Sequence, residues 1–168
     1  DVAARGNFCT LKDDGNILDR RANRIVSNQS AELVDLLNDI QVDGVTINVL
    51  PVIDYRFVLV INGLGLSPNI SETDPQLIGV PIPKSFAKDE GASFTASVVN
   101  EFTDKAKKLL QRTNLAANGI LLRGFSVVPN LPNFCDSYRL NAAAIAAYPM
   151  YKGIAELIGM KILGTPNN

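Results

Sequence analysis

The stretch GVTINVLPVIDYRFVLVING, at positions 44–63, constrains the fold of this chain more than any other segment. Apolar residues at positions 45, 47 and 49 alternate with polar ones, which is the pattern of a strand with one solvent-facing side. Residues 57–61 form an unbroken apolar run of strand length. Pro51 cannot donate a backbone hydrogen bond and the aspartate after it favours a turn, so the two strands are predicted to form a β-hairpin. Arg56 begins the second strand, where a cation needs water or an anionic partner.

Two amphipathic helices are predicted on either side of this hairpin. Apolar residues recur at i, i+3, i+4 and i+7 from Leu33 to Ile40, and at helical spacing again from Val98 to Leu110. Ser30 is the expected N-cap of the first helix, with Ser27 as the competing position. The predicted order is strand 7–11, helix 30–41, strands 45–50 and 56–61, helix 97–112 and strand 118–123.

This order, β-α-β-β-α-β, is typical of a ferredoxin-like α+β domain, in which an antiparallel sheet carries both helices on one face. The C-terminal part adds a predicted strand at 140–147 and a short helix at 150–158 that ends at Gly159. The sheet does not need these elements, so we expect them to begin a neighbouring α/β domain. Because the chain starts with Asp1 and not with Met, we expect it to be part of a longer protein.

The segment at 62–95 has no periodic pattern and contains several prolines and glycines. Connections of this length are usually binding loops or lids, so we expect it to be mobile and to become ordered when a ligand binds. Within it, SETDP at 71–75 carries two carboxylates and two hydroxyls. A turn or helix cap is the simpler interpretation of this motif, and contact with a polar substrate is the alternative.

Composition and charge exclude several classes of function. The chain has 16 basic and 17 acidic residues and a net charge of −1, which argues against binding to nucleic acid or to a membrane surface. No apolar run approaches the roughly 20 residues of a membrane-spanning helix, and the first residues do not resemble a signal peptide, so we expect a soluble cytoplasmic protein. The chain contains no histidine, so self-contained catalysis is not expected. Cys9 and Cys135 could pair, but reduced thiols are the expectation.

The densest basic cluster is DRRANR at positions 19–24, with three arginines in five residues. A guanidinium group binds phosphate or carboxylate through two hydrogen bonds, so the cluster is a candidate anion-binding surface. The strand at 118–123 also ends in an arginine. The alternative, which local sequence favours for the cluster, is a solvated loop that forms ion pairs with Asp13, Asp14 and Asp19.

A series of motifs extends along the chain in one order: RGNFCT (5–10), DRRANRI (19–25), YRFVLVINGLGLS (55–67), SETDP (71–75), NEFTDKAKKLL (100–110), NGILLRG (118–124) and AAAIAAYPMYKGIAELIGM (142–160). Together they resemble the archaeal type of cofactor-independent (2,3-bisphosphoglycerate-independent) phosphoglycerate mutase. The resemblance implies an alkaline phosphatase-like metalloenzyme, with two divalent metal ions (Mn or Zn/Mg) in its core and an inserted substrate-binding domain. It implies that residues 1–133 are that inserted domain and that residues 134–168 begin the returning core.

The resemblance further implies that the full-length enzyme interconverts 2- and 3-phosphoglycerate in glycolysis and gluconeogenesis through a phosphoserine in the missing core. The remainder of the same polypeptide is therefore an implied partner, and this part alone is expected to have no catalytic metal and no mutase activity. No catalytic residue is implied in this chain. The implied substrate-binding residues are Arg5, Arg20, Arg21, Arg24, Arg56, Asp74 and Arg123.

The chain departs from the expected family pattern at four positions, where arginine, two aspartates and lysine are replaced by Asn62, Pro68, Glu72 and Asn141. A divergent phosphatase or phosphonate-handling relative is therefore an alternative. A stand-alone ferredoxin-like module that binds a small effector is another, although such a module is expected to begin with Met and to end after its last strand. An RNA-binding module is weaker still, because Phe8 and Phe57 alone do not form a base-stacking platform.

Overall fold

The computed structural model describes residues 1–164 and divides into two compact units, one spanning Asp1–Val127 and a smaller one that starts at Val128. The first unit carries the sheet and the two long helices, and the second contains only short elements. The end of the predicted second domain, residues 165–168, lies outside the described residues. No helix within residues 1–164 is long and apolar enough to cross a membrane.

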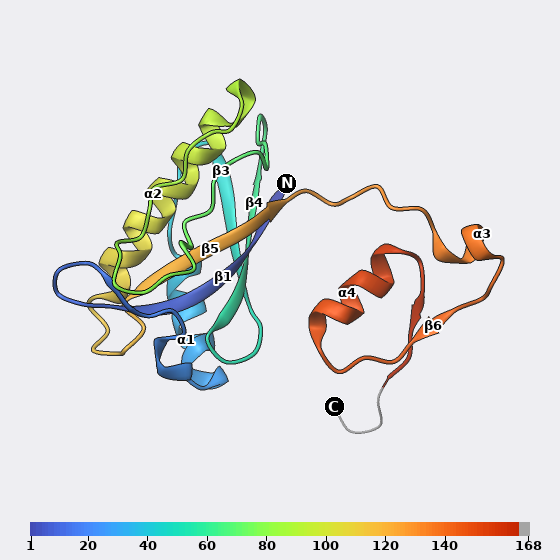
Figure 1. Cartoon of the computed structure of the whole chain (residues 1–168), viewed down its shortest axis with the longest axis horizontal. Coiled ribbons are helices and arrows are strands. Elements are labelled where there is room, and N and C mark those ends of the chain that lie inside the picture. The colour runs from blue at the N-terminus through green and yellow to red at the C-terminus, as the bar shows by residue number, and fades with distance from the viewer. Residues whose placement is uncertain (165–168) are drawn as a thin grey trace. The chain divides into compact units, whose positions relative to one another are not determined.

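In the first unit the main elements follow one another in the predicted order β-α-β-β-α-β (Figure 1). A short strand and two 3-10 turns lie between them. The elements are β1 (Val2–Leu11), β2 (Ile17–Asp19), η1 (Ala22–Arg24), α1 (Ser27–Asn38), β3 (Val45–Pro51), β4 (Arg56–Gly63), η2 (Glu90–Ala92), α2 (Ser93–Leu110) and β5 (Gly119–Ser126).

Strand β1 lies at the centre of the sheet and pairs antiparallel with β4 on one side and β5 on the other. Strand β3 pairs with β4 in the predicted hairpin, with Ile47 opposite Ile61. Strand β2 pairs with the last residues of β1, where β4 has already ended. The strand order β3-β4-β1-β5 is that of a ferredoxin-like sheet, so the predicted α+β fold is confirmed.

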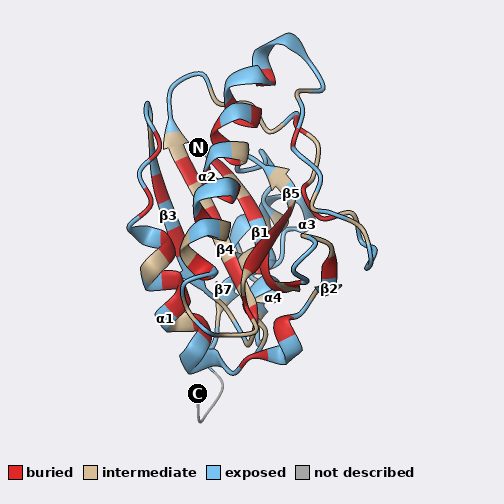
Figure 2. Cartoon of the chain, turned by 90° about the vertical axis from the view of Figure 1, so that its left-hand side faces the viewer, coloured by how far each residue is buried: buried red, intermediate tan, exposed pale blue. Residues whose placement is uncertain are grey.

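The hydrophobic core lies between one face of this sheet and the two helices. Phe8 of β1 and Phe57 of β4 are fully buried, and their ring centroids are 4.9 Å apart. Gly6 lies opposite Phe57, and a Cβ at this position would overlap the Phe57 ring. Leu37 of α1 and Phe102 of α2 belong to the same cluster. Both helices therefore cover the same face of the sheet, as Figure 2 shows with the buried residues in red.

Several element boundaries differ from the prediction by a few residues, and two of these differences have a clear physical cause. Strand β1 begins at Val2 and not at residue 7, because pairing on both sides holds the weak strand formers of VAARG in extended form. Helix α1 begins at Ser27 with Val26 as its N-cap, and no side chain caps it, so the cap prediction was wrong. Ser30 is buried in the first turn, and the Ser27 hydroxyl accepts a hydrogen bond from the backbone N–H of Asp54, at 3.1 Å. The start of α1 is thus tied to the turn of the hairpin.

The long segment between β4 and α2 is anchored to two strands. The backbone N–H of Thr73 donates to the Leu122 carbonyl of β5, and the Thr73 hydroxyl accepts from the Leu122 N–H, both at 2.9 Å. Further along, the Val80 carbonyl accepts from the N–H of Ile17 in β2. Between these contacts, Leu77 and Ile78 are exposed. These contacts anchor the segment on either side of an exposed tip, and the mobility of the segment stays a prediction.

The second unit consists of α3 (Phe134–Tyr138), β6 (Ala143–Ala144), α4 (Pro149–Leu157) and β7 (Lys161–Ile162). Strands β6 and β7 pair in parallel and α4 connects them. The predicted helix is present and is followed by Gly159, whose φ of +78° suits glycine. The predicted strand at 140–147 is reduced to two residues, and α3 was not predicted. The sequence feature that could have indicated α3 is Asn133, a residue type that often caps helices. Its side chain accepts a hydrogen bond from the N–H of Cys135, at 2.8 Å, and caps the helix.

Candidate anion-binding site

The site lies on the face of the sheet opposite the helices. Because side chains alternate along a strand, Arg5 and Asn7 of β1 point away from the face on which Phe8 packs. In the register of the sheet, Arg5 lies opposite Arg123 of β5, and Asn7 lies opposite Arg56 of β4. The sheet thus brings three arginines that are distant in sequence onto one surface.

Arg20 and Arg21 reach this surface from the turn that follows β2. The Asp19 carboxylate shapes this turn by accepting hydrogen bonds from the backbone N–H groups of Arg21, at 3.0 Å, and Asn23, at 2.6 Å. Asn23 and Arg24 have φ values of 54° and 55°, which are uncommon for residues with a side chain. Asp19 therefore organises the backbone of the arginine cluster, a role that differs from the ion pairing of the solvated-loop alternative.

Five arginines line one pocket of about 240 Å³: Arg5, Arg20, Arg21, Arg56 and Arg123. The residues described as lining it include no carboxylate. Guanidinium groups gathered in this way create a locally positive potential, even on a chain whose net charge is only −1. The volume lies below the roughly 300 Å³ at which pockets for drug-sized ligands begin, so the pocket suits a small anion.

Arg20 is held in place by Asp74 of the long segment. The Arg20 Nε donates to Asp74 Oδ1 at 3.1 Å, and its Nη2 donates to Oδ2 at 2.8 Å. The Asp74 side chain is 1% exposed and that of Arg20 27%. Asp74 Oδ1 also accepts the backbone N–H of Gln76, at 2.9 Å. Asp74 thus lies behind the pocket wall, where it orients Arg20, and it is not itself one of the lining residues.

Arg56 is oriented by the residue before it. Its guanidinium carbon lies 4.6 Å from the centre of the Tyr55 ring, and Nη2 donates to the Tyr55 hydroxyl at 2.9 Å. Nη1 is 4.0 Å from Asp54 Oδ2. Arg24 lies outside the arginine pocket and lines an adjoining hollow of about 220 Å³ together with Arg21, Tyr55 and Arg56. The predicted arginines therefore occupy two neighbouring hollows.

Sequence reasoning missed three residues of the pocket: Asn7, Tyr55 and Gln76. Asn7 shares a face with Arg5 in β1, but the predicted strand began at residue 7 and left Arg5 out, so the pairing of the two was not visible. Tyr55 directly precedes Arg56 in the hairpin turn. Gln76 carried no signal, because its position depends on the backbone turn that Asp74 holds at a φ of 57°.

The four departures from the family pattern lie outside the residues that line the arginine pocket. Asn62 accepts a hydrogen bond from the Asn48 side chain across the hairpin, at 2.8 Å. The Pro68 carbonyl accepts the N–H of Ile70. Glu72 accepts the N–H of Gly124, at 3.0 Å, just after Arg123. Asn141 is exposed in the second unit.

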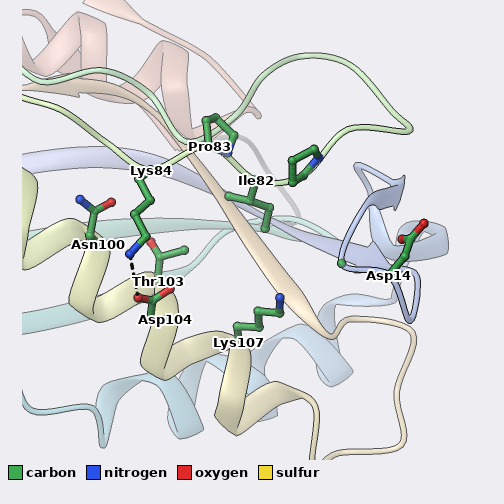
Figure 3. A pocket seen from close by; sticks show the side chains of 10 residues that line it. Asp14, Ile82, Pro83, Lys84, Asn100, Thr103, Asp104 and Lys107 are labelled. Carbon is green, nitrogen blue, oxygen red and sulfur yellow. Dashed lines mark ion pairs between the residues drawn. The ribbon is translucent and has the colours of Figure 1, made fainter.

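A second hollow, of about 260 Å³, lies between α2, the turn after β1 and residues 81–84 (Figure 3). Its charged groups are mixed: Lys84 pairs with Asp104 at 3.7 Å, and Lys107 and Asp14 supply one further charge of each sign. Asp14, Lys84 and Asp104 are exposed, and Lys107 is half-buried. Because these charges cancel, this hollow is a weaker anion site than the arginine pocket, although its volume is similar.

The cysteines and acidic residues of the described part of the chain do not gather into a metal-binding cluster. Within residues 1–164, no group of three or more His, Cys, Asp or Glu side chains is placed to hold a metal ion. Cys9 is buried, Cys135 is half-buried and both thiols are free. Burial, with the nearby Asp74 and Asp19, raises the pKa of the Cys9 thiol far above its ordinary value. Cys9 therefore stays protonated and is not a nucleophile.

Comparison with known proteins identifies the family. The family model described as 2,3-bisphosphoglycerate-independent phosphoglycerate mutase matches residues 1–115. A probable 2,3-bisphosphoglycerate-independent phosphoglycerate mutase of Thermosipho melanesiensis is 45% identical over 98% of this chain and 41% of its own length. The corresponding protein of Deinococcus radiodurans is 44% identical over 97% of the chain and 41% of its own length. These relatives are bacterial, so they support the family and not the archaeal subtype.

Two solved structures share the fold. The cofactor-independent phosphoglycerate mutase of Thermoplasma acidophilum superposes with a TM-score of 0.73 at 30% identity, over 99% of this chain and 48% of that protein. The PH0037 protein of Pyrococcus horikoshii gives a TM-score of 0.66 over 99% of this chain and 38% of its own, but at 19% identity it supports the fold alone. The chain spans about 41% of the length of the curated relatives. It belongs to the family of 2,3-bisphosphoglycerate-independent phosphoglycerate mutases.

Proposed function

We propose that this chain is the substrate-binding part of a phosphoglycerate mutase that interconverts 2-phosphoglycerate and 3-phosphoglycerate, and that its arginine pocket grips the glycerate. The observation that carries the proposal is the convergence of five arginines on one small pocket without a lining carboxylate. Phosphoglycerate carries a carboxylate and a phosphate, and both accept paired hydrogen bonds from guanidinium groups. A small pocket with several fixed guanidinium groups matches a ligand with two anionic ends.

The work of this chain would be positioning. In a mutase, the same glycerate must present first one hydroxyl and then the other to the phosphoryl group, so its carboxylate needs a fixed anchor. Arg20 is pre-oriented by Asp74, and Arg56 by the Tyr55 ring and hydroxyl. Such preorganised groups bind the ligand without a large loss of side-chain freedom. On this proposal Asp74 is a positioning residue and the arginines contact the substrate.

The chemistry of transfer would lie in the remainder of the polypeptide. The alkaline phosphatase-like core, its phosphoserine and its two divalent metal ions (Mn or Zn/Mg) belong to the proposal through family resemblance alone. The described residues do not fit a metal centre, so no metal chemistry is assigned to this chain. Residues 1–133 would form the inserted domain and residues 134–168 the start of the returning core. Free thiols suit the reducing cytoplasm, where glycolysis operates.

The test is the kinetics of the full-length enzyme with Arg21→Ala or Arg56→Ala. Loss of one charge-assisted contact to the substrate should cost about 2 to 3 kcal/mol, which lowers kcat/KM by about 30- to 150-fold. Arg112→Ala is the matched control, because this arginine lines a separate hollow at the end of α2. Normal kinetics in both pocket variants would refute the proposal. Release of inorganic phosphate in place of the isomer would favour the divergent phosphatase.

A further inference from the structure

Two polar atoms in the wall of the arginine pocket are buried without a hydrogen-bond partner. They are the Oδ1 of Asn7 and the Nε of Arg56. Asn7 is 7% exposed, and both residues line the pocket. Buried polar groups in folded proteins nearly always have a partner, so two unpaired ones at one site need an explanation.

The two atoms belong to side chains that face each other. Asn7 and Arg56 are directly opposed in the antiparallel register of β1 and β4, where Cα atoms are about 4.5 to 5.5 Å apart. Of the other two nitrogens of Arg56, Nη2 donates one hydrogen bond to the Tyr55 hydroxyl and Nη1 lies 4.0 Å from Asp54 Oδ2. Nε is the donor of Arg56 that is buried without a hydrogen-bond partner. Asn7 contributes an unpaired acceptor from the facing strand.

A ligand group that pairs with both atoms must donate a hydrogen bond to Asn7 Oδ1 and accept one from Arg56 Nε. A hydroxyl donates one hydrogen bond and accepts others, whereas an ionised carboxylate or phosphate can only accept. Asn7 Oδ1 therefore cannot be satisfied by either anionic end of a ligand. A hydroxyl that donates to Asn7 Oδ1 and accepts from Arg56 Nε satisfies both atoms at once.

We infer that Asn7 and Arg56 bind the free hydroxyl group of the glycerate, and that Asn7 is a specificity-determining residue that selects hydroxylated carboxylates. The inference rests on the proposed function, in which the remaining arginines hold the carboxylate and phosphate. In 3-phosphoglycerate this free hydroxyl is on carbon 2. A site built to hydrogen-bond a hydroxyl rejects the analogue without it, because its buried polar atoms then stay unpaired.

The test compares two ligands on the full-length enzyme: 3-phosphoglycerate, and 3-phosphonooxypropanoate, which lacks the hydroxyl at carbon 2. The wild-type enzyme is expected to bind the hydroxylated ligand at least about tenfold more tightly, measured as KM against the inhibition constant of the analogue. In Asn7→Leu, which keeps the side-chain size, this ratio should fall toward one. Thr10→Val is the control: Thr10 also has an unpaired buried hydroxyl on β1, but it points to the opposite face and does not line the pocket.

The outcomes separate the inference from the proposed function. A wild-type enzyme that binds both ligands equally overturns the inference without any variant. An Asn7→Leu enzyme that is folded by its thermal transition and keeps the wild-type ratio overturns it as well. An enzyme that neither binds nor converts phosphoglycerate refutes the proposed function itself. The assignment of Asn7 is supported if Asn7→Leu no longer prefers 3-phosphoglycerate over the analogue while Thr10→Val keeps this preference.

Discussion

Replacing Asp74 by asparagine tests whether this residue holds Arg20 in place. The bidentate pair has N···O distances of 3.1 and 2.8 Å, and the carboxylate is 1% exposed. Removal of one partner from a buried ion pair costs about 3 to 5 kcal/mol, because the remaining charge stays buried. The Arg20 side chain keeps 27% exposure, so water recovers part of this loss. The free energy of unfolding should therefore fall by about 2 to 3 kcal/mol.

The assay is urea unfolding of the chain in a double-mutant cycle with Arg20→Gln. The coupling energy between the two positions should be about 2 kcal/mol, because the groups share one interaction. The pair Lys105–Glu101 on α2 is the control: its N···O distance is 2.6 Å, but both side chains are nearly half exposed. Such a surface pair should couple by about 0.3 to 0.5 kcal/mol. A coupling between Arg20 and Asp74 no larger than this would refute the reasoning.

Two further predictions concern the sheet. Gly6→Ala should destabilise the chain by about 3 kcal/mol or more in urea unfolding, because the new Cβ would overlap the Phe57 ring; an unchanged midpoint would contradict this packing. The Cys9 thiol should resist a thiol-specific reagent in the native chain up to about pH 9, because burial raises its pKa and keeps it protonated, whereas Cys135 should react. Modification of both cysteines at the same rate would contradict the burial of Cys9.

The hairpin and the two helices could be predicted because their periodic patterns record which face is buried. Residues 45–49 alternate and become β3, and the apolar run from Phe57 lies in the centre of the sheet as β4. The first half of β1 could not be predicted, since VAARG has little intrinsic strand preference and becomes extended through its pairing with β4 and β5. The intrinsic strand propensity of a segment does not depend on its pairing partners, so it cannot predict a strand that forms because of those partners.

The arginine pocket was accessible to sequence reasoning only in part. Family resemblance pointed to the arginines, and their convergence follows from the sheet register and from the turn after β2. The role of Asp74 was not accessible, because it lies 54 positions from Arg20 in the sequence and acts through a contact that the long segment creates. Arg24 was predicted with its neighbours, but the positive φ values of η1 place it beside the adjoining hollow.

Several features that disfavour folding occur together at this pocket. Five arginines gather there, Asn7 and Arg56 leave buried polar atoms unpaired, and η1 beside them has three consecutive residues with positive φ. Each feature costs stability, and the hydrophobic core on the other face of the sheet has no comparable cluster of charge. Natural sequences break local rules mainly where function requires it. An anion with a hydroxyl group would relieve two of these costs at once, by neutralising the guanidinium charge and by pairing the Asn7 and Arg56 atoms.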